Sequence, residues 1–167
     1  MRTLIALAAL GAAAFSSAQI GTPTNVAFRL GAAYPLDNTT RDSVKNFIGV
    51  GIDYFLERSL VEGGETSLSF DWLGKSGSGA KGNIFPIMLN QRWYNQGSTV
   101  DDRKSYFFVG AGVAIVDVTS TKTVLAGRAG YGVLFGEHLF GEMNFVLSDD
   151  ANGARATSIG AYIGYRF

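Results

Sequence analysis

The chain ends in Ser158-Ile-Gly-Ala-Tyr-Ile-Gly-Tyr-Arg-Phe167, ten residues in which two kinds of side chain alternate. The odd-numbered positions are all apolar or aromatic, whereas the even-numbered positions carry serine, glycine, tyrosine and one arginine. Successive side chains of a β-strand point to opposite faces, so the segment is predicted to be a strand with one wholly apolar face. This is the pattern of a strand that contacts lipid on one side and lines a barrel lumen on the other.

Seven earlier segments show the same alternation: Asn25–Tyr34, Phe47–Leu56, Glu65–Leu73, Asn83–Tyr94, Tyr106–Val116, Thr123–Phe135 and Leu139–Ser148. Each has roughly 9–12 residues, the length that a tilted strand needs to cross a bilayer. The fourth strand is the weakest, because Pro86 cannot donate to a ladder and predicts a bulge or a later strand start. The sequence therefore predicts an all-β fold, an eight-stranded antiparallel up-and-down transmembrane β-barrel.

A soluble barrel or sandwich, such as a lipocalin-like carrier, is the alternative for so many alternating strands. Such a fold turns its apolar face inward and its charges outward. Here the polar face is crowded with glycine, which occurs 22 times in the chain, and its charges are few and of both signs. Eight strands enclose only enough room for side chains, and glycine keeps that interior small. The composition favours the membrane barrel.

The N-terminal residues 1–18 have the layout of a cleaved signal peptide. Arg2 supplies the positive region, Leu4–Phe15 is an apolar run, and Ser16-Ser17-Ala18 places small residues before a cleavage site at Gln19. The run is too short for a spanning helix, although a buried N-terminal helix is the alternative. The predicted barrel domain is then 19–167, and the protein is exported.

The charge balance and the cysteine content exclude nucleic acid as a partner and disulfides as a support of the fold. The chain has 14 basic and 14 acidic residues, so no nucleic acid is implied as a partner. It has no cysteine, so no disulfide supports the fold. The sequence predicts neither a cofactor nor a metal.

Eight ionisable residues fall on the face that is predicted to line the lumen. They are Arg29, Asp53, Glu65, Asp71, Arg92, Arg128, Glu142 and Arg166. Neighbouring strands suggest pairing of Arg29 with Asp53, Asp71 with Arg92, and Arg128 with Glu142. Buried charges are tolerated when they are paired, so the set predicts a plug of ion pairs. A gated pore, in which an arginine changes its acidic partner, is the alternative.

Aromatic residues of the apolar face are predicted to form two girdles at the headgroup levels. If the N-terminus is periplasmic, the upper girdle contains Tyr34, Trp72 and Phe85. The lower girdle contains Tyr54, Trp93 and Phe135, with Phe167 at the same level.

At this point the mature chain resembles the barrel domain of small outer-membrane proteins of the OmpA/OmpX type. The most specific element is the outward series Ile159, Ala161, Ile163, Tyr165 and Phe167, which resembles the C-terminal signal read by the barrel-assembly machinery. The resemblance implies insertion into the outer membrane of a Gram-negative-type bacterium, after transit with periplasmic chaperones. It also implies contact with outer-membrane lipids and lipopolysaccharide.

The connections between strands are assigned to two sides under this topology. Outward connections are Pro35–Lys45, Lys75–Lys81, Asp117–Thr121 and Asp149–Arg155, and periplasmic ones are Arg58–Gly64, Asn95–Lys104 and Gly136–His138. Asp149 and Asp150 predict ordinary turn chemistry, and a divalent cation that bridges lipopolysaccharide is the alternative.

Three functions remain after this interpretation of the sequence. The first is a monomeric, non-enzymatic envelope protein with a structural or surface-interaction role and a plugged lumen. The second is a narrow channel for small or apolar solutes. The third is a lipid A-modifying enzyme, which needs a histidine near catalytic partners. The single histidine, His138, falls in a tight periplasmic turn, so we expect no enzyme.

Overall fold

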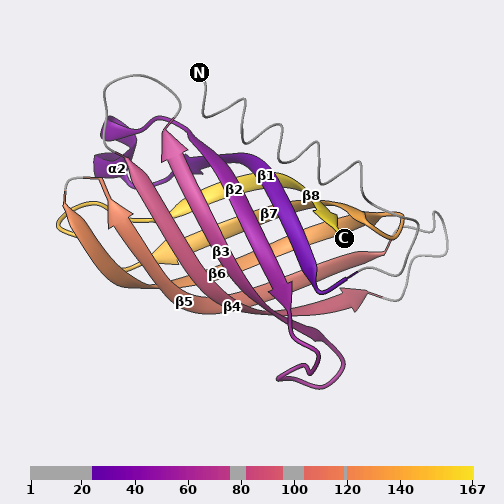
Figure 1. Cartoon of the computed structure of the whole chain (residues 1–167). Coiled ribbons are helices and arrows are strands. Elements are labelled where there is room, and N and C mark those ends of the chain that lie inside the picture. The colour runs from indigo at the N-terminus through magenta and orange to yellow at the C-terminus, as the bar shows by residue number, and fades with distance from the viewer. Residues whose placement is uncertain (1–23, 76–81, 96–103, 119) are drawn as a thin grey trace.

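The computed structural model describes residues 24–75, 82–95, 104–118 and 120–167, which form a barrel of eight strands and one short helix (Figure 1). The elements are β1 (Val26–Pro35), α2 (Asn38–Ser43), β2 (Phe47–Phe55), β3 (Glu65–Lys75), β4 (Asn83–Asn95), β5 (Ser105–Asp117), β6 (Thr121–Phe135), β7 (Leu139–Ser148) and β8 (Ser158–Arg166). The predicted signal peptide, 1–18, lies outside the described residues, as do 76–81 and 96–103 of two predicted loops.

The eight strands form one closed antiparallel sheet. Each strand pairs with its sequence neighbours, and β1 pairs with β8 to close the ring. The predicted all-β, eight-stranded, up-and-down barrel is therefore confirmed. Among the described residues, no helix has the length and apolar character needed to span a membrane.

The barrel has two distinct ends. The helix α2 marks one end, and the C-terminus lies at the other (Figure 1). We call them the α2 end and the C-terminal end.

The two faces of the strands differ as the alternation predicts. Large apolar residues on the outer face are widely exposed, for example Leu30 (54%), Phe107 (53%) and Ile163 (67%). Their neighbours along the chain point inward and are buried, among them Arg29 (1%) and Phe108 (3%). The barrel is thus apolar outside and mixed inside, the reverse of a soluble protein.

The prediction of a bulge or late start at Pro86 is wrong. Strand β4 already begins at Asn83, and Phe70 pairs with Ile87 while Leu73 pairs with Ile84. Between these two pairs, β3 and β4 each have two residues, so the described register holds no bulge there. Pro86 instead faces Ala114 of β5.

The helix α2 was not predicted. It lies in the β1–β2 connection, where the Asp37 side chain accepts a hydrogen bond from the backbone N–H of Thr40 at 2.9 Å. Aspartate in this position is a common helix N-cap, so the local signal was present in the sequence. Six residues are too few for a hydrophobic periodicity to reveal them.

Buried side chains fill the lumen in two apolar clusters. The cluster toward the α2 end includes Val44, Phe47, Ile84, Met88 and Tyr162, together with alanines of the β7–β8 connection. The cluster toward the C-terminal end contains Ala27, Phe55, Tyr106, Phe108 and Phe140. Buried apolar side chains therefore lie toward both ends of the lumen.

Glycines on the inner face leave room for these rings. A Cβ on Gly49 would lie 2.6 Å from the Tyr162 ring, and one on Gly160 would lie equally close. Tyr106 likewise occupies the space over Gly132, which is its partner in the register of β5 and β6. The abundance of glycine thus follows from close packing inside a narrow barrel.

Candidate functional site

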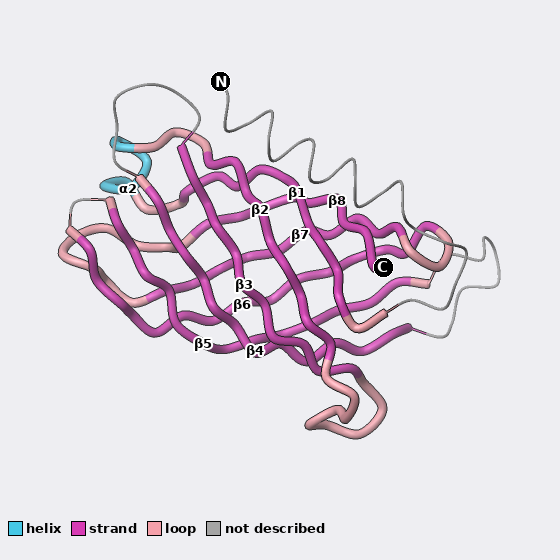
Figure 2. The backbone as a smooth tube through the Cα atoms, viewed as in Figure 1, coloured by secondary structure: helices cyan, strands magenta, loops and turns pink. Residues whose placement is uncertain are grey.

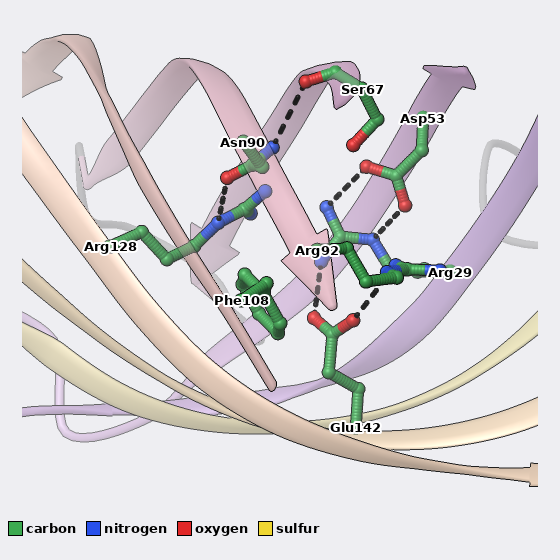
Figure 3. Close-up of a pocket in the computed structure, with 8 residues that line it drawn as sticks. All are labelled: Arg29, Asp53, Ser67, Asn90, Arg92, Phe108, Arg128 and Glu142. Carbon is green, nitrogen blue, oxygen red and sulfur yellow. Dashed lines mark hydrogen bonds and ion pairs between the residues drawn. The ribbon is translucent and has the colours of Figure 1, made fainter. Parts of the chain in front are cut away.

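An ion-pair network occupies the middle of the lumen, centred on Arg29 of β1 (Figure 3). Its guanidinium contacts three carboxylates: Nε lies 2.9 Å from Asp53 Oδ2, Nη2 lies 2.8 Å from Asp71 Oδ1, and Nη1 lies 2.8 Å from Glu142 Oε1. These acidic residues belong to β2, β3 and β7. A single arginine therefore joins strands from opposite sides of the barrel.

Arg128 and Arg92 extend the network in two directions. Arg128 Nη1 lies 2.6 Å from Asp71 Oδ2, and its Nη2 donates to Ser69 Oγ at 2.7 Å. Arg92 Nη2 lies 3.6 Å from Glu142 Oε2. Three arginines thus share three carboxylates, and the charges balance within the buried network.

Two of the three pairings expected from neighbouring strands are not those of the structure. Arg29 does contact Asp53, but Asp71 contacts Arg29 and Arg128 rather than Arg92. The ion pair of Glu142 with Arg92 replaces the expected pair with Arg128. The reason is geometric, because side chains of all strands converge in a narrow lumen and reach partners across it.

Aromatic rings surround Arg92, which has the longest ion pair of the buried network. The Arg92 guanidinium carbon lies 4.1 Å from the centroid of Tyr106, 4.9 Å from that of Phe55 and 5.8 Å from that of Phe140. The negative face of an aromatic ring attracts a cation at these distances. The Tyr106 hydroxyl also donates to Glu142 at 3.1 Å.

Glu65 and Arg166 form a separate pair toward the C-terminal end. Arg166 Nη1 lies 3.2 Å from Glu65 Oε2, and both side chains are partly exposed. The Tyr94 hydroxyl donates to the same glutamate. All eight predicted lumen charges therefore face inward, in one buried network of six and one pair nearer the opening.

The sequence did not reveal the polar and aromatic partners of these charges. Ser69, Asn90 and Tyr106 each bond to a member of the network, and the Asn90 side chain accepts from Arg128 Nε at 3.1 Å. A usable signal is the pairing of a large inward ring with glycine on the next strand, as with Phe108 and Gly130. That signal requires the register, which alternation alone does not specify.

The space between the charged side chains has no room for a water molecule. It is lined by Arg29, Asp53, Ser67, Asn90, Arg92, Phe108, Arg128 and Glu142 (Figure 3). The network contacts both apolar clusters, since Arg92 lies against Phe55 and Arg29 lies 5.6 Å from the Tyr162 centroid. The charge network therefore lies between the two apolar clusters and touches both of them.

His138 takes part in structural contacts at the C-terminal end. Its Nδ1 lies 2.6 Å from the Arg166 carbonyl oxygen, and its ring stacks on Tyr165 at 5.3 Å. In the part of the chain that the structure describes, no group of three or more acidic or histidine side chains could hold a metal ion. Asp150 accepts from the Gly153 N–H at 2.7 Å and lies 3.7 Å from Arg155, which is ordinary turn chemistry.

The structure places the aromatic residues of the predicted girdles in two groups. Tyr34, Trp72 and Phe85 lie near the α2 end of their strands, and Tyr54, Trp93 and Phe135 lie near the other end. The Trp72 indole donates to Asn83 Oδ1 at 3.0 Å, and Trp93 stacks on Phe107 at 5.1 Å. The apolar series of β8 also points outward, with Ile159 43% and Ile163 67% exposed.

Comparison with known proteins finds similar folds among solved structures but no similar sequence family. No protein-family model matches the sequence, and no curated protein is similar enough to count as a relative. Solved structures do match. Neisserial surface protein A gives a TM-score of 0.53 at 10% identity, covering 88% of this chain and 100% of that one. The N-terminal barrel domain of Pseudomonas aeruginosa OprF gives 0.51 at 16% identity, covering 87% and 100%.

The chain has the fold of the small outer-membrane barrels. A barrel from the de novo design of transmembrane β-barrels is equally similar, with a TM-score of 0.52 at 12% identity and coverage of 88% and 98%. Natural and designed chains thus share this small-barrel fold, so the fold alone assigns no activity. The features specific to this chain are the side chains that fill its lumen.

Proposed function

We propose that the protein is a closed, non-enzymatic β-barrel of the outer membrane of a Gram-negative-type bacterium, with a structural or surface-interaction role in the envelope. The observation that carries this proposal is the packed lumen. The six buried charges leave no room for water between them, and apolar clusters cover them on both sides. A solute would have to displace paired charges from a dry interior, which is costly.

The outer face supports the placement in a membrane. Its exposed apolar residues form a band around the barrel, and the two aromatic groups lie toward its ends. In this placement the α2 end faces outward and the C-terminal end faces the periplasm. Outer-membrane lipids and lipopolysaccharide then surround a monomeric barrel.

Export and assembly follow from the two ends of the sequence. Residues 1–18 act as the cleaved signal peptide, and periplasmic chaperones deliver the chain. The outward residues Ile159, Ala161, Ile163 and Tyr165 of β8, together with Phe167 directly after it, are the signal for the barrel-assembly machinery. The exposure of Ile159 and Ile163 supports this role, since a binding protein can reach side chains of the outer face.

The contacts of His138 support a non-enzymatic role. The ring is fixed between the Arg166 carbonyl and Tyr165, and the turn that carries it lies on the periplasmic side in this placement. Lipid A-modifying chemistry at the outer rim would need the catalytic groups at the opposite end of the barrel.

Planar-bilayer recording tests the closed lumen. The purified wild-type barrel is expected to give no stable unitary conductance steps, because the space between the buried charges has no room for a water molecule. A general porin, inserted into the same bilayer, shows that the recording detects an open pore.

Two arginine variants make the test specific. The opposite result is that the wild type gives stable steps whose size changes in Arg92→Ala but not in Arg155→Ala at the exposed rim. That result would contradict the structural role and favour the narrow channel. Arg155 is the matched control because its side chain is 51% exposed, whereas that of Arg92 is 6% exposed.

A further inference from the structure

Two neighbouring polar residues lie on the outer face of β3 and β4. Thr66 of β3 and Gln91 of β4 are direct partners in the register, and both alternate with lumen residues such as Ser67 and Asn90. Their side chains therefore point outward. They are nevertheless buried, with Thr66 1% and Gln91 9% exposed.

The β2–β3 loop, residues 56–64, covers this polar pair from outside. The Leu60 N–H donates to Thr66 Oγ1 at 2.7 Å, and Gln91 Nε2 donates to Ser59 Oγ at 2.9 Å. Thr66 Oγ1 in turn donates to Gln91 Oε1 at 2.6 Å. The loop is thus hydrogen-bonded to the barrel wall. Figure 2 shows it extending beyond the outline of the barrel toward the C-terminal end.

The covered pair indicates how deep the loop reaches. Gln91 is two residues nearer the middle of β4 than Trp93, and Trp93 belongs to the aromatic group of the C-terminal end. A side chain at that depth borders the apolar part of the membrane, where unpaired polar groups are costly. The loop residues that satisfy Thr66 and Gln91 must therefore lie at the same depth.

The loop presents its apolar residues away from the barrel. Leu60 is 67% exposed and Val61 is 47% exposed, although neither lies on a strand. Exposed charged residues, Glu57, Arg58 and Glu62, flank them. An apolar pair flanked by charged side chains suits a headgroup region, where both hydrocarbon and water are within reach.

We propose that the β2–β3 loop is a membrane-interface anchor, which inserts Leu60 and Val61 into the phospholipid leaflet at the C-terminal end of the barrel. The loop continues the apolar outer face past the strand ends and seals the Thr66–Gln91 pair from lipid. This inference rests on the proposed placement of the barrel in a membrane. The occupant of the patch is the phospholipid itself rather than a protein.

Site-directed spin labelling tests the anchor directly, because the chain contains no native cysteine. Leu60→Cys and Val61→Cys are labelled with a nitroxide and reconstituted in phosphatidylethanolamine and phosphatidylglycerol vesicles. Dissolved oxygen concentrates in the bilayer, whereas a neutral nickel chelate stays in water. We expect both labels to collide more often with oxygen than with the nickel chelate.

Two control positions separate this proposal from the placement of the barrel. Leu30→Cys lies on the outer face of β1 and reports hydrocarbon, and Glu137→Cys lies in the exposed β6–β7 turn at the same end and reports water. Band mobility in unboiled gel samples verifies that each variant is folded.

Three other outcomes of the labelling experiment would each contradict a different part of the proposal. If Leu30 reports lipid while Leu60 and Val61 match Glu137, the anchor is wrong and the membrane placement stands. If Leu30 also reports water, the membrane placement itself fails. Labels shielded from both reagents, with dipolar broadening between them, would show that a second copy covers the loop and would overturn the lipid contact.

Discussion

At the scale of single residues, the lumen depends on Glu142. Its carboxylate contacts Arg29 at 2.8 Å and Arg92 at 3.6 Å, and it accepts from the Tyr106 hydroxyl. A buried ion-pair network contributes little net stability compared with well-packed apolar residues of similar volume. Removal of the Glu142 carboxylate alone, however, leaves positive charge buried without compensation.

Glu142→Gln is therefore expected to lower the free energy of unfolding by about 3–5 kcal/mol. The amide keeps the volume of the side chain but loses the charge that faces two guanidiniums. The measurement is urea unfolding in detergent micelles, followed by tryptophan fluorescence. Asp150→Asn, in an exposed pair with Arg155, is the control and should change the same free energy by less than about 1 kcal/mol. Equal midpoints for wild type and Glu142→Gln would refute the charge plug.

At the scale of elements, strands β1 and β2 depend on glycine to accommodate one ring of β8. Tyr162 of β8 packs over Gly49 of β2 and Gly31 of β1, and a Cβ on either glycine would overlap the ring or its backbone. The strands approach one another closely because these positions have no side chain.

Gly49→Ala should destabilise the barrel by about 1–3 kcal/mol, since the ring has little free space into which it can move. In the Tyr162→Ala background the same substitution should cost much less, because the ring that it meets is gone. Gly127→Ala is the matched control. The nearest atom to its added Cβ is 3.7 Å away, which is ordinary contact. Additive effects of Gly49→Ala and Tyr162→Ala would contradict this packing.

At the scale of the whole molecule, closure of the sheet governs resistance to unfolding. Each strand is paired on both sides, so the described strands leave no open edge along the barrel wall at which unfolding could start. The packed lumen adds to this resistance, since the strands cannot separate without exposing the charge network.

The unboiled protein should therefore migrate at a different apparent mass from the boiled protein in SDS gel electrophoresis. It should also remain in the membrane pellet of an isolated outer-membrane fraction. A soluble periplasmic protein with no mobility shift would instead favour a ligand-carrying β-fold, with the polar and apolar faces exchanging their roles.

The β2–β3 loop illustrates what alternation cannot show. Thr66 and Gln91 break the apolar series of their strands, and on the sequence alone they are simply exceptions. The structure explains them, because Ser59 and Leu60 return along the outer wall and satisfy their hydrogen bonds. Such long-range covers depend on the path of a loop, which has no periodicity to read.

The sequence by itself determined the strand number, the two faces and the inward position of the eight charges, because an extended backbone imposes a two-residue period on every side chain. Only the tertiary structure decided which charges pair. Arg29 finds Glu142 on β7 and Asp71 on β3 because barrel closure brings distant strands within reach of one side chain. The local pattern specifies the direction of a side chain, and the diameter and register of the closed barrel specify what it meets.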